Sequence, residues 1–563
     1  MSEKPIIECV PNFSEGNNLQ IIKQITDCIE GVEGVTLLDV DPGKATNRTV
    51  VTFVGHPEAV IEAAYLAIVK ASELIDMSTH KGEHPRMGAT DVCPLIPVSG
   101  ITMDETSTYA IKLAERVGRE TKIPVYLYGY AQPNSERNNL SIIRSGEYEG
   151  FFEKIKQPQW KPDFGPDVYN AKAGATVIGA RDFLIAYNIN LNTKSTRIAN
   201  RIAFDVREAG RVKRLGNPIS GEIMLDEKGE PIRIAGKCKE VKAIGWYIEE
   251  YGIAQISANL TNYIVTPVHV FFEEVNSSAV SRGVRITGSE LVGLVPLSAM
   301  REAGKYFLKK QERSIGVSEK ELVEIAIKSL GLDELGPFDP NKKIIEYRMK
   351  NINNQLIDLS CKAFADETAS ESAAPGGGSI AAYTGALGAA LATMVANVSA
   401  NKKGWEHRWE YFSNIAEKGQ SIKDELLRLV DEDTNAFNGI MEAFKLPKTT
   451  DDERLVRLNA IESASLYATQ VPLQTMQIAN TILEIAKEMI EHGNQNTLSD
   501  AAAGVLCSKT AVQAAYYNVM INAKGLADKA MALKLAGEAK ALLQNNTEVS
   551  NTLLKEVDTK IDF

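Results

Sequence analysis

The sequence has no surplus of positive charge and no clustered cysteines. Its 563 residues include 62 Lys and Arg against 73 Asp and Glu, a formal net charge of -11. That balance argues against nonspecific binding to nucleic acid, which depends on a basic surface. The six cysteines lie far apart, without a CxxC pair or metal-ligand spacing. We therefore expect free thiols in a reducing compartment, the cytoplasm, and no metal site.

Long apolar runs are also scarce. The beginning of the chain, MSEKPIIECVPNF, has no apolar core of signal-peptide length, so we expect no secretory leader. The segment 379–398, SIAAYTGALGAALATMVANV, has the roughly 20 residues that a membrane-spanning helix needs. It consists mostly of Ala, Gly, Ser and Thr, so its hydrophobic drive is weak. We interpret it as a buried helix with closely packed neighbours, and we expect no membrane span.

The local patterns divide the chain, which is too long for one core, into several parts. The first part reads strand, helix, hairpin, helix, strand. From about residue 183 the pattern starts again, since FLIAYNINLN resembles IIECVPNFS. After about residue 350 long helical patterns replace the strands. The predicted fold is multidomain, with two similar α+β sandwich subdomains (1–180 and 181–332), a linker (333–352) and an all-α antiparallel helical bundle (353–563).

Finer features complete this prediction. In the second subdomain the runs VKAIGWYI, GIAQISANL and TPVHVFFEEV precede a helix near 276–283, and the segment 212–238 reads as an insertion or mobile hairpin. The bundle helices are predicted near 354–367, 378–400, 405–444, 451–491, 498–522 and 524–557, the fourth with a bend at Pro472.

The stretch HKGEHPRMGATDVCP (80–94) is the first candidate site. Two of the six histidines of the chain lie in it, at positions 80 and 84, among charged residues and helix-breaking Gly and Pro. It follows a helical pattern and precedes an apolar run, so it is a loop rich in groups that transfer protons near neutral pH. A solvated or structural histidine is the competing interpretation.

Two further features belong to the first half. Asp41 and Arg48 flank the turn DPGKATNR, and an arginine held by a turn can bind a carboxylate through two hydrogen bonds. A surface ion pair of little energetic value is the alternative. The segment PDFGPDVYNAKAGATVIGAR (162–181) has glycine turns that let the backbone approach a flat ligand. It lacks GxGxxG after a strand, so we do not predict a dinucleotide site.

The helical half has a glycine-rich helix start. SAAPGGGSIAAYTG (372–385) places three glycines before a helix, where the helix N-terminus favours an anion or a group rich in lone pairs. No Lys-Ser or Lys-Thr follows, so it is not a P-loop. A flexible helix start packed against its neighbours is the alternative.

Asp433 is the candidate proton donor of this half. It falls on an apolar stripe of the predicted helix 424–444, which is made of Leu426, Val430, Phe437, Ile440 and Phe444. Desolvation raises the pKa of a carboxyl group, which suits proton donation near neutral pH. A buried structural aspartate is the alternative.

Several motifs together resemble known folate enzymes. ECVPNFSEG, DVDPGKATNRTVVTFVG, HKGEHPRMGATDVCP, DFGP, GARDFLIAYNIN and AIGWY are similar to glutamate formimidoyltransferases. SAAPGGGSIAA, LVDEDTNAF, KLPK and NQNTLSDAAAG are similar to folate cyclodeaminases. Their order resembles the bifunctional formimidoyltransferase-cyclodeaminase family of histidine degradation over nearly the whole chain.

This resemblance implies an activity. We expect transfer of the formimino group from N-formimino-L-glutamate to tetrahydrofolate, then cyclisation of 5-formimino-tetrahydrofolate to 5,10-methenyltetrahydrofolate with release of ammonia. Tetrahydrofolate, with polyglutamylated forms among its variants, is a co-substrate, and no metal is required. The family also implies a homo-oligomer, an octamer. The alternatives are a helical half that acts as a methenyltetrahydrofolate cyclohydrolase, and a folate-binding scaffold without catalysis.

The resemblance also assigns residues. The catalytic histidine of the transferase falls on His84, which leaves His80 a supporting place, and the cyclodeaminase carboxylate falls on Asp433. We expect Asp41 to orient His84 and Arg48 to hold a substrate carboxylate. The folate-binding segment falls on Gly165, Pro166, Asp167, Val168, Tyr169, Asn170, Ala171, Lys172, Ala173 and Gly174.

Overall fold

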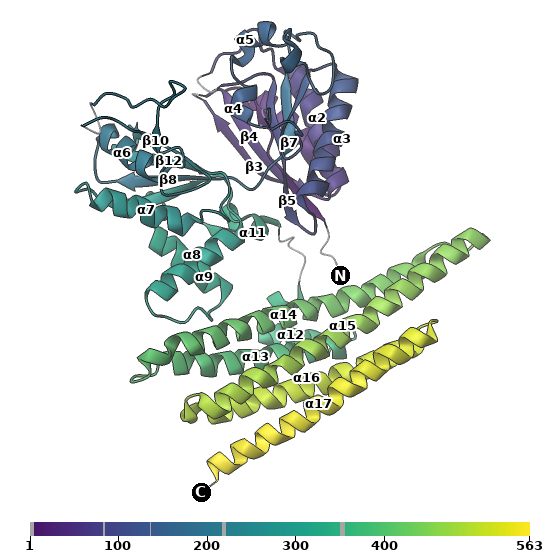
Figure 1. Ribbon diagram of the computed structural model, residues 1–563. Helices are drawn as coiled ribbons and strands as arrows, with labels where there is room; N and C mark the ends of the chain where they lie inside the picture. The colour runs from purple at the N-terminus through teal and green to yellow at the C-terminus, as the bar shows by residue number, and fades with distance from the viewer. Residues whose placement is uncertain are drawn as a thin grey trace. The chain divides into compact units, whose positions relative to one another are not determined.

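The computed structural model describes residues 5–44, 46–82, 85–135, 137–216, 221–349 and 355–562 (Figure 1). The chain divides into two compact units. One comprises Met1–Met300 with Leu330–Lys350, and the other comprises Arg301–Ser329 with Asn351–Phe563. The first unit contains both large sheets and the second consists of helices with short connections, which confirms the predicted multidomain fold of α+β subdomains followed by a helical bundle.

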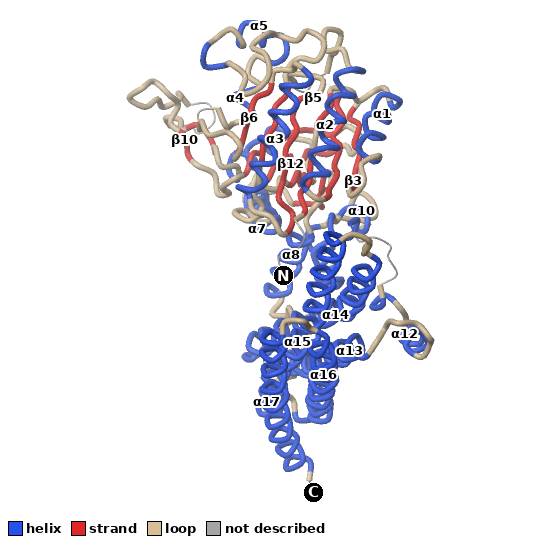
Figure 2. Tube along the Cα trace, turned by 90° about the vertical axis from the view of Figure 1, so that its right-hand side faces the viewer, coloured by secondary structure: helices blue, strands red, loops and turns tan. Residues whose placement is uncertain are grey.

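The larger sheet of the first unit is mixed. Its strands run in the order β3, β4, then β1 and β2 in line, β5, β7 and β6, and only the contacts of β7 with β5 and β6 are parallel. Helices α1, α2 and α3 cover one face (Figure 2). The bounds are β1 Ile6–Cys9, β2 Asn12–Phe13, α1 Leu19–Glu30, β3 Val35–Gly43, β4 Arg48–Gly55, α2 Pro57–Leu74, β5 Thr90–Ser99, α3 Met103–Thr121, β6 Val125–Gly129, α4 Leu140–Ile143, α5 Glu147–Lys154, the 3-10 turn Pro158–Trp160 and β7 Thr176–Ala180.

The smaller sheet of this unit is antiparallel, in the order β11, β12, β8 and β13. Its elements are β8 Ile185–Leu191, α6 Thr196–Val206, β11 Val241–Ile248, β12 Ile253–Leu260, α7 Val268–Val280 and β13 Ile286–Val292. Most of TPVHVFFEEV lies in α7, so the helix begins earlier than 276, and β13 was not predicted. The short strands β9 (Arg211–Val212) and β10 (Arg233–Ile234) pair with each other near the two ends of the predicted insertion 212–238. Residues 217–220 lie outside the described ranges.

The predicted domain boundaries stay predictions, and part of the predicted linker lies in the first compact unit. Within the interval 333–352, α10 (Pro340–Lys343) and α11 (Ile345–Met349) belong to the first unit. Ile344 and Ile345 are buried there, and the Leu297 amide donates a hydrogen bond to Glu346 over 2.7 Å. The interval is therefore exposed at 334–337 and packed around Ile344 and Ile345, where its apolar residues join a core.

The second unit is a bundle of long helices. The bounds are α8 Leu297–Lys310, which begins in the first unit, α9 Glu319–Leu330, α12 Cys361–Thr368, α13 Gly377–Ala400, α14 Trp409–Lys445, α15 Asp451–His492, α16 Leu498–Gly525 and α17 Lys529–Ile561, with 3-10 turns at Leu356–Asp358, Glu406–Arg408 and Gln495–Thr497. The predicted ranges agree closely from α13 onward. Helix α15 continues through Pro472.

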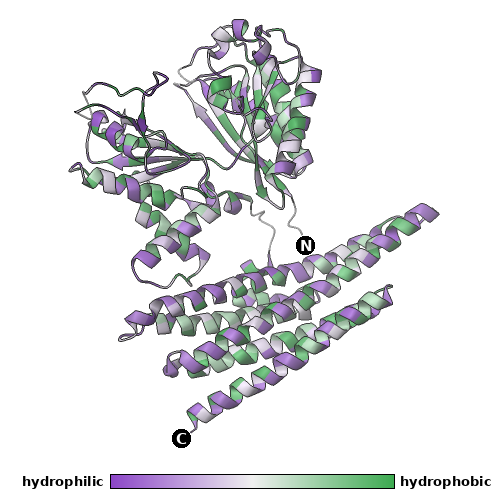
Figure 3. Cartoon of the chain, viewed as in Figure 1, coloured by the Kyte–Doolittle hydropathy of each residue, from purple (hydrophilic) through white to green (hydrophobic). Residues whose placement is uncertain are grey.

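Small residues let α13 pack at the centre of this bundle. A Cβ atom on Gly388 would lie 2.8 Å from the Cβ atom of Cys507, so α13 and α16 are in close contact there. By length and composition α13 meets the requirements of a membrane span, yet 61% of its most apolar window is buried inside the unit, as in the core helix of a bundle. Figure 3 shows hydrophobic residues on the inner helices and on the strands of the larger sheet.

The connection between α8 and α9 is seated on α13 and α14. The Ser314 hydroxyl donates to Asn397 Oδ1 over 2.7 Å, and the Ile315 amide donates to Ser413 Oγ over 3.0 Å. Gly316 lies so close to α14 that an added Cβ would be 2.2 Å from the Cβ of Ala416. These contacts explain why 301–329 groups with the helical unit.

Candidate active sites

Residues 90–94 of the predicted loop form the start of β5, and the segment before this strand is held in place by His80. Nε2 of His80 lies 2.9 Å from the Asn47 carbonyl oxygen, and Nδ1 accepts a hydrogen bond from Arg86 Nε over 3.2 Å. With both ring nitrogens occupied by the loop and the hairpin turn, His80 has a supporting role. Glu83 and His84 lie outside the described residues, so the catalytic role of His84 stays a prediction.

This loop packs directly against the predicted folate segment. The Ala89 amide donates to the Ala173 carbonyl over 2.8 Å, and the Ala175 amide donates to the Met87 carbonyl over 3.1 Å. Gly174 has a φ of +70°, and a Cβ there would lie 2.2 Å from the Met87 oxygen, so the close approach requires glycine. The fold thus brings together the histidine loop and a segment almost ninety residues later in the chain.

The folate segment changes from exposed to buried along its length. Tyr169 stacks on Phe152 with ring centroids 3.7 Å apart, and Val168 beside it is 66% exposed. At the other end Ala173 and Gly174 are buried. An exposed apolar surface next to stacked rings suits contact with a flat heterocycle, but the assignment of Gly165 to Gly174 to folate binding stays a prediction.

Arg48 is paired differently from what the turn suggested. Its Nε donates to Asn12 Oδ1 over 2.8 Å, and its Nη1 lies 3.5 Å from Asp91 Oδ2, whereas Asp41 is exposed on β3. Burial lowers the pKa of Arg48 to about 10, and the Asp91 carboxylate opposes that change. The ion pair of Arg48 is therefore made with Asp91 and not with Asp41, and the substrate roles of Arg48 and Asp41 remain predictions.

Asp91 is the centre of a buried ionic cluster that the sequence did not single out. Its side chain is fully buried, accepts from the Met87 amide over 3.0 Å, and is ion-paired with both Arg48 and Arg144. Buried charges persist only when paired and hydrogen-bonded. The available signal was an aspartate at the start of an otherwise buried strand, TDVCPLI.

We expect Asp91→Asn to destabilise the first unit. The change leaves two arginines in a buried cluster without their shared negative charge, a loss of about 3–5 kcal/mol in the free energy of unfolding. Urea unfolding of the full chain, followed by intrinsic fluorescence, measures the shift. Asp27→Asn is the matched control, since Asp27 forms only an exposed ion pair with Lys23. Equal unfolding midpoints for the two variants would contradict the structural role.

In the helical unit, Asp433 lies against the glycine-rich start of α13. Its Oδ2 accepts from the Ser379 amide over 2.9 Å and from the Ser379 hydroxyl over 3.2 Å. A Cβ on Gly378 would lie 2.1 Å from Asp433 Oδ1, so the carboxyl group rests on the Cα of that glycine. Two features that are separate in the sequence, Asp433 and the PGGGS segment, therefore form one site.

Two effects act on the pKa of Asp433 in opposite directions. Burial raises the pKa of this carboxyl group, and the hydrogen bonds from Ser379 lower it to a smaller extent, so that the pKa lies above its ordinary value. A carboxyl group with a raised pKa keeps its proton to a higher pH, and it can donate that proton to a leaving group.

The apolar stripe predicted around Asp433 is only partly correct. Leu426 and Val430 are buried, but Phe437 is 40% exposed and Phe444 is 51% exposed. Ala436 and Ala443 are buried on α14 in their place. The phenylalanines suggested a wider core than the unit has at that end.

Asp431, expected nearer the polar face, is half-buried and accepts from the Leu356 amide over 2.7 Å.

Gly378→Ala tests this contact. The added methyl group overlaps the carboxyl group, so Asp433 has to move away from Ser379, and we expect the activity that depends on Asp433 to fall at least tenfold. Gly439→Ala is the control, because Gly439 is exposed on the surface of α14 and an added Cβ would have nothing within 4 Å. Steady-state kinetics of both variants make the comparison. An unchanged rate in Gly378→Ala would show that the contact is dispensable.

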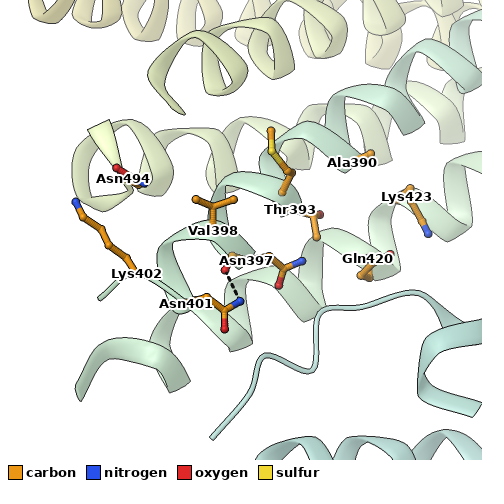
Figure 4. Close-up of a pocket in the computed structure, with 10 residues that line it drawn as sticks. Ala390, Thr393, Asn397, Val398, Asn401, Lys402, Gln420, Lys423 and Asn494 are labelled. Atoms are coloured by element: carbon orange, nitrogen blue, oxygen red, sulfur yellow. Dashed lines mark hydrogen bonds between the residues drawn. The ribbon is translucent and has the colours of Figure 1, made fainter. Parts of the chain in front are cut away.

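The helical unit also contains a hollow (Figure 4). It has a volume of about 600 Å³ and is lined by Ala390, Thr393, Met394, Asn397, Val398, Asn401, Lys402, Gln420, Lys423 and Asn494. Thr393 follows Ser379 by fourteen residues of α13, about 21 Å along a helix axis. Asn397 Nδ2 and Gln420 Nε2 both donate to the Gly316 carbonyl. These side chains hold the α8–α9 connection.

Possible metal ligands are dispersed. Across the described ranges, no group of three or more His, Cys, Asp and Glu side chains is placed so as to hold a metal ion.

Comparisons with known proteins cover both units. Three family models match: the N-terminal subdomain of the formiminotransferase domain at 6–181, the formiminotransferase domain at 186–350, and formiminotransferase-cyclodeaminase at 360–541. The chain is 42% identical to formimidoyltransferase-cyclodeaminase of Mus musculus, over 96% of each chain.

Shorter relatives match the two halves separately. Glutamate formimidoyltransferase of Thermoplasma acidophilum is 41% identical over 54% of this chain and 92% of its own length. Methenyltetrahydrofolate cyclohydrolase of Methylorubrum extorquens is 34% identical over 36% of this chain and 97% of its own length.

Proposed function

The chain belongs to the formimidoyltransferase-cyclodeaminase family, and on that basis we propose that it catalyses two consecutive reactions on folate. It transfers the formimino group of N-formimino-L-glutamate to tetrahydrofolate. It then cyclises 5-formimino-tetrahydrofolate to 5,10-methenyltetrahydrofolate with release of ammonia. Asp433 supports the second reaction, because it is held against the first turn of α13 with a raised pKa.

The transfer is assigned to the first unit. N5 of tetrahydrofolate attacks the amidine carbon, and the bond from that carbon to the glutamate nitrogen breaks. His84 removes the proton from N5 and gives it to the departing glutamate nitrogen, a role worth about 10²–10⁴-fold in rate. His80 supports the loop through its contacts with the Asn47 carbonyl oxygen and with Arg86. Gly165 to Gly174, in contact with this loop, binds the folate, Arg48 holds a substrate carboxylate and Asp41 orients His84.

The cyclisation is assigned to the second unit. N10 forms a bond to the formimino carbon, and the bond from that carbon to its terminal nitrogen breaks. The nitrogen leaves with the electron pair as ammonia. It carries its own hydrogen, the hydrogen of N10 and one proton supplied through Asp433, and the methenyl product carries the positive charge. The carboxyl group supplies the proton when the amine is expelled.

A second candidate function has one observation in its favour. The helical half is 34% identical to a methenyltetrahydrofolate cyclohydrolase over nearly all of that protein. A cyclohydrolase in this half would add water to the methenyl group and would release no ammonia. The two readings therefore differ in a measurable product.

The decisive experiment supplies both substrates to the full chain. Methenyl absorbance and ammonia are measured together, and we expect one ammonia for each methenyl group formed. Hydrolysis of supplied 5,10-methenyltetrahydrofolate, together with no ammonia from supplied 5-formimino-tetrahydrofolate, would favour the cyclohydrolase. Tight folate binding without any product would favour the non-catalytic scaffold.

We also propose the cytoplasm as location, a homo-oligomeric state with an octamer as its form, and polyglutamylated folate as a substrate form. The six free cysteines support a reducing compartment, and two of them, Cys9 and Cys93, lie buried with sulfur atoms 3.5 Å apart. Native mass spectrometry tests the octamer. Steady-state kinetics with monoglutamyl and polyglutamyl folate test whether the polyglutamylated form is a substrate.

A further inference from the structure

The three glycines at the start of α13 have different surroundings. A Cβ on Gly378 would overlap Asp433, which comes from α14. A Cβ on Gly377 would make ordinary contact with the side-chain amide of Asn518, 3.4 Å from its Nδ2, and Asn518 comes from α16. A Cβ on Gly376 would have only the Ala373 oxygen nearby, at 3.9 Å. The first turn of α13 thus lies between a carboxyl group and a carboxamide, with open space beside it.

Successive residues of a helix are offset by 1.5 Å along its axis. Gly377 and Gly378 are successive, so Asn518 and Asp433 reach the same turn of α13 from two different helices. Successive helix positions also differ by about 100° around the axis, so the two side chains approach this turn from neighbouring sides, and a substrate group placed over the turn between them can contact both. The half-buried position of Asn518 leaves it accessible to such a group.

The amide nitrogen of the Asn518 side chain already makes a hydrogen bond within the protein. Nδ2 donates to the Ala514 carbonyl over 3.0 Å, which also fixes which end of the side chain is oxygen. Among the described residues, Oδ1 has no hydrogen-bond partner. Oδ1 is therefore an acceptor available to a ligand, beside a carboxyl group whose Oδ2 is occupied by Ser379.

We propose, on the basis of the proposed cyclodeaminase reaction, that Asn518 Oδ1 accepts a hydrogen bond from the nitrogen that leaves as ammonia and so holds it against Asp433. After N10 has added, that nitrogen carries N–H groups that need acceptors in a partly desolvated site. Asp433 supplies the proton and cannot satisfy them all. A carboxamide oxygen also favours an amino leaving group over a hydroxyl group, which has fewer hydrogens to donate.

The test compares three variants of the full chain. Asn518→Leu keeps the size of the side chain and removes the acceptor, Asn518→Asp keeps an acceptor oxygen, and Asn545→Leu makes the same chemical change on the exposed face of α17. Cyclisation of supplied 5-formimino-tetrahydrofolate is followed by methenyl absorbance and ammonia, and transfer is measured separately on each variant.

For Asn518→Leu we expect kcat of cyclisation to fall about tenfold to a hundredfold, with KM and the transfer rate near wild type. Asn518→Asp should keep more of the cyclisation rate than Asn518→Leu, and Asn545→Leu all of it. Wild-type cyclisation in Asn518→Leu, or equal losses in Asn518→Leu and Asn518→Asp, would overturn the inference.

Two safeguards keep the result clear. If Asn518→Leu fails to fold, Asn518→Ala takes its place, with added formamide as a replacement acceptor that should restore part of the rate. No restoration by formamide would then count against the inference. A wild-type chain that releases no ammonia overturns the proposed function itself, whereas ammonia release that is insensitive to residue 518 overturns only the role of Asn518.

Discussion

Asp433→Asn should stop ring closure and leave formimino transfer intact. Asparagine can still accept the hydrogen bonds from Ser379, so the geometry at the start of α13 is kept while the transferable proton is lost. We expect cyclisation of supplied 5-formimino-tetrahydrofolate to fall at least a hundredfold, within the range of about 10²–10⁴-fold that positioned acids contribute. Methenyl absorbance measures the loss, and formation of 5-formimino-tetrahydrofolate from both substrates measures transfer.

The stability of this variant separates chemistry from folding. The folded-state pKa of Asp433 is raised, so its contribution to stability is fully present below the unfolded pKa and is lost as pH rises through the folded pKa. Wherever the wild-type group is ionised, it therefore bears a cost of burial that neutral asparagine avoids. We expect the unfolding midpoint of Asp433→Asn to equal or exceed that of the wild type.

Asp431→Asn is the matched control. Asp431 lies two residues earlier on α14, is half-buried, and also has a pKa raised by burial, but it accepts from the Leu356 amide instead of Ser379. We expect it to retain cyclisation. If Asp431→Asn lost ring closure and Asp433→Asn kept it, the proton donor would have been assigned to the wrong carboxyl group.

His84→Ala should have the opposite effect. Without a group to move the proton from N5 to the departing nitrogen, transfer should fall by about 10²–10⁴-fold, while cyclisation of supplied 5-formimino-tetrahydrofolate continues. Coupled assays on the full chain report both rates. Imidazole added to His84→Ala should restore part of the transfer, because it can enter the space left by the side chain and carry the proton.

Alanine variants of two other histidines serve as comparisons for the loss of transfer in His84→Ala. His56 is exposed at the start of α2 and makes no side-chain capping hydrogen bond, so His56→Ala should be neutral. His80→Ala removes the contacts with Asn47 and Arg86, so it should disturb the loop and reduce transfer less than His84→Ala does. Wild-type transfer in His84→Ala would refute the assignment of the proton shuttle.

The sequence was a good guide where side-chain periodicity is strong. The long helices from α13 to α17 were predicted closely because their apolar positions recur over many turns. Strand β7 was missed since its residues follow a glycine-rich segment that reads as turns, and α7 was predicted too short because its apolar start, VHVFF, has strand-like composition.

Site geometry was less accessible to the sequence, because it depends on contacts between distant segments. The catalytic candidate Asp433 could be named from its helix, but its contact with Ser379 joins positions 54 residues apart. The pairing of Arg48 with Asp91 likewise depends on the register of the larger sheet and not on the turn that presents Arg48. Motifs identified these residues one at a time, and the fold determines which of them meet.

The packing of the α8–α9 connection against α13 and α14 affects any attempt to express the two activities as separate proteins. A piece that ends at residue 332 would carry Ile315, which is 2% exposed in the whole chain, into solvent. A piece that begins at residue 353 would leave Asn397 and Gln420 without the Gly316 carbonyl that both now share. The segment 330–350 packs in the first unit, whereas 301–329 packs in the helical unit, so no single cut of the chain leaves both segments with the unit to which they belong.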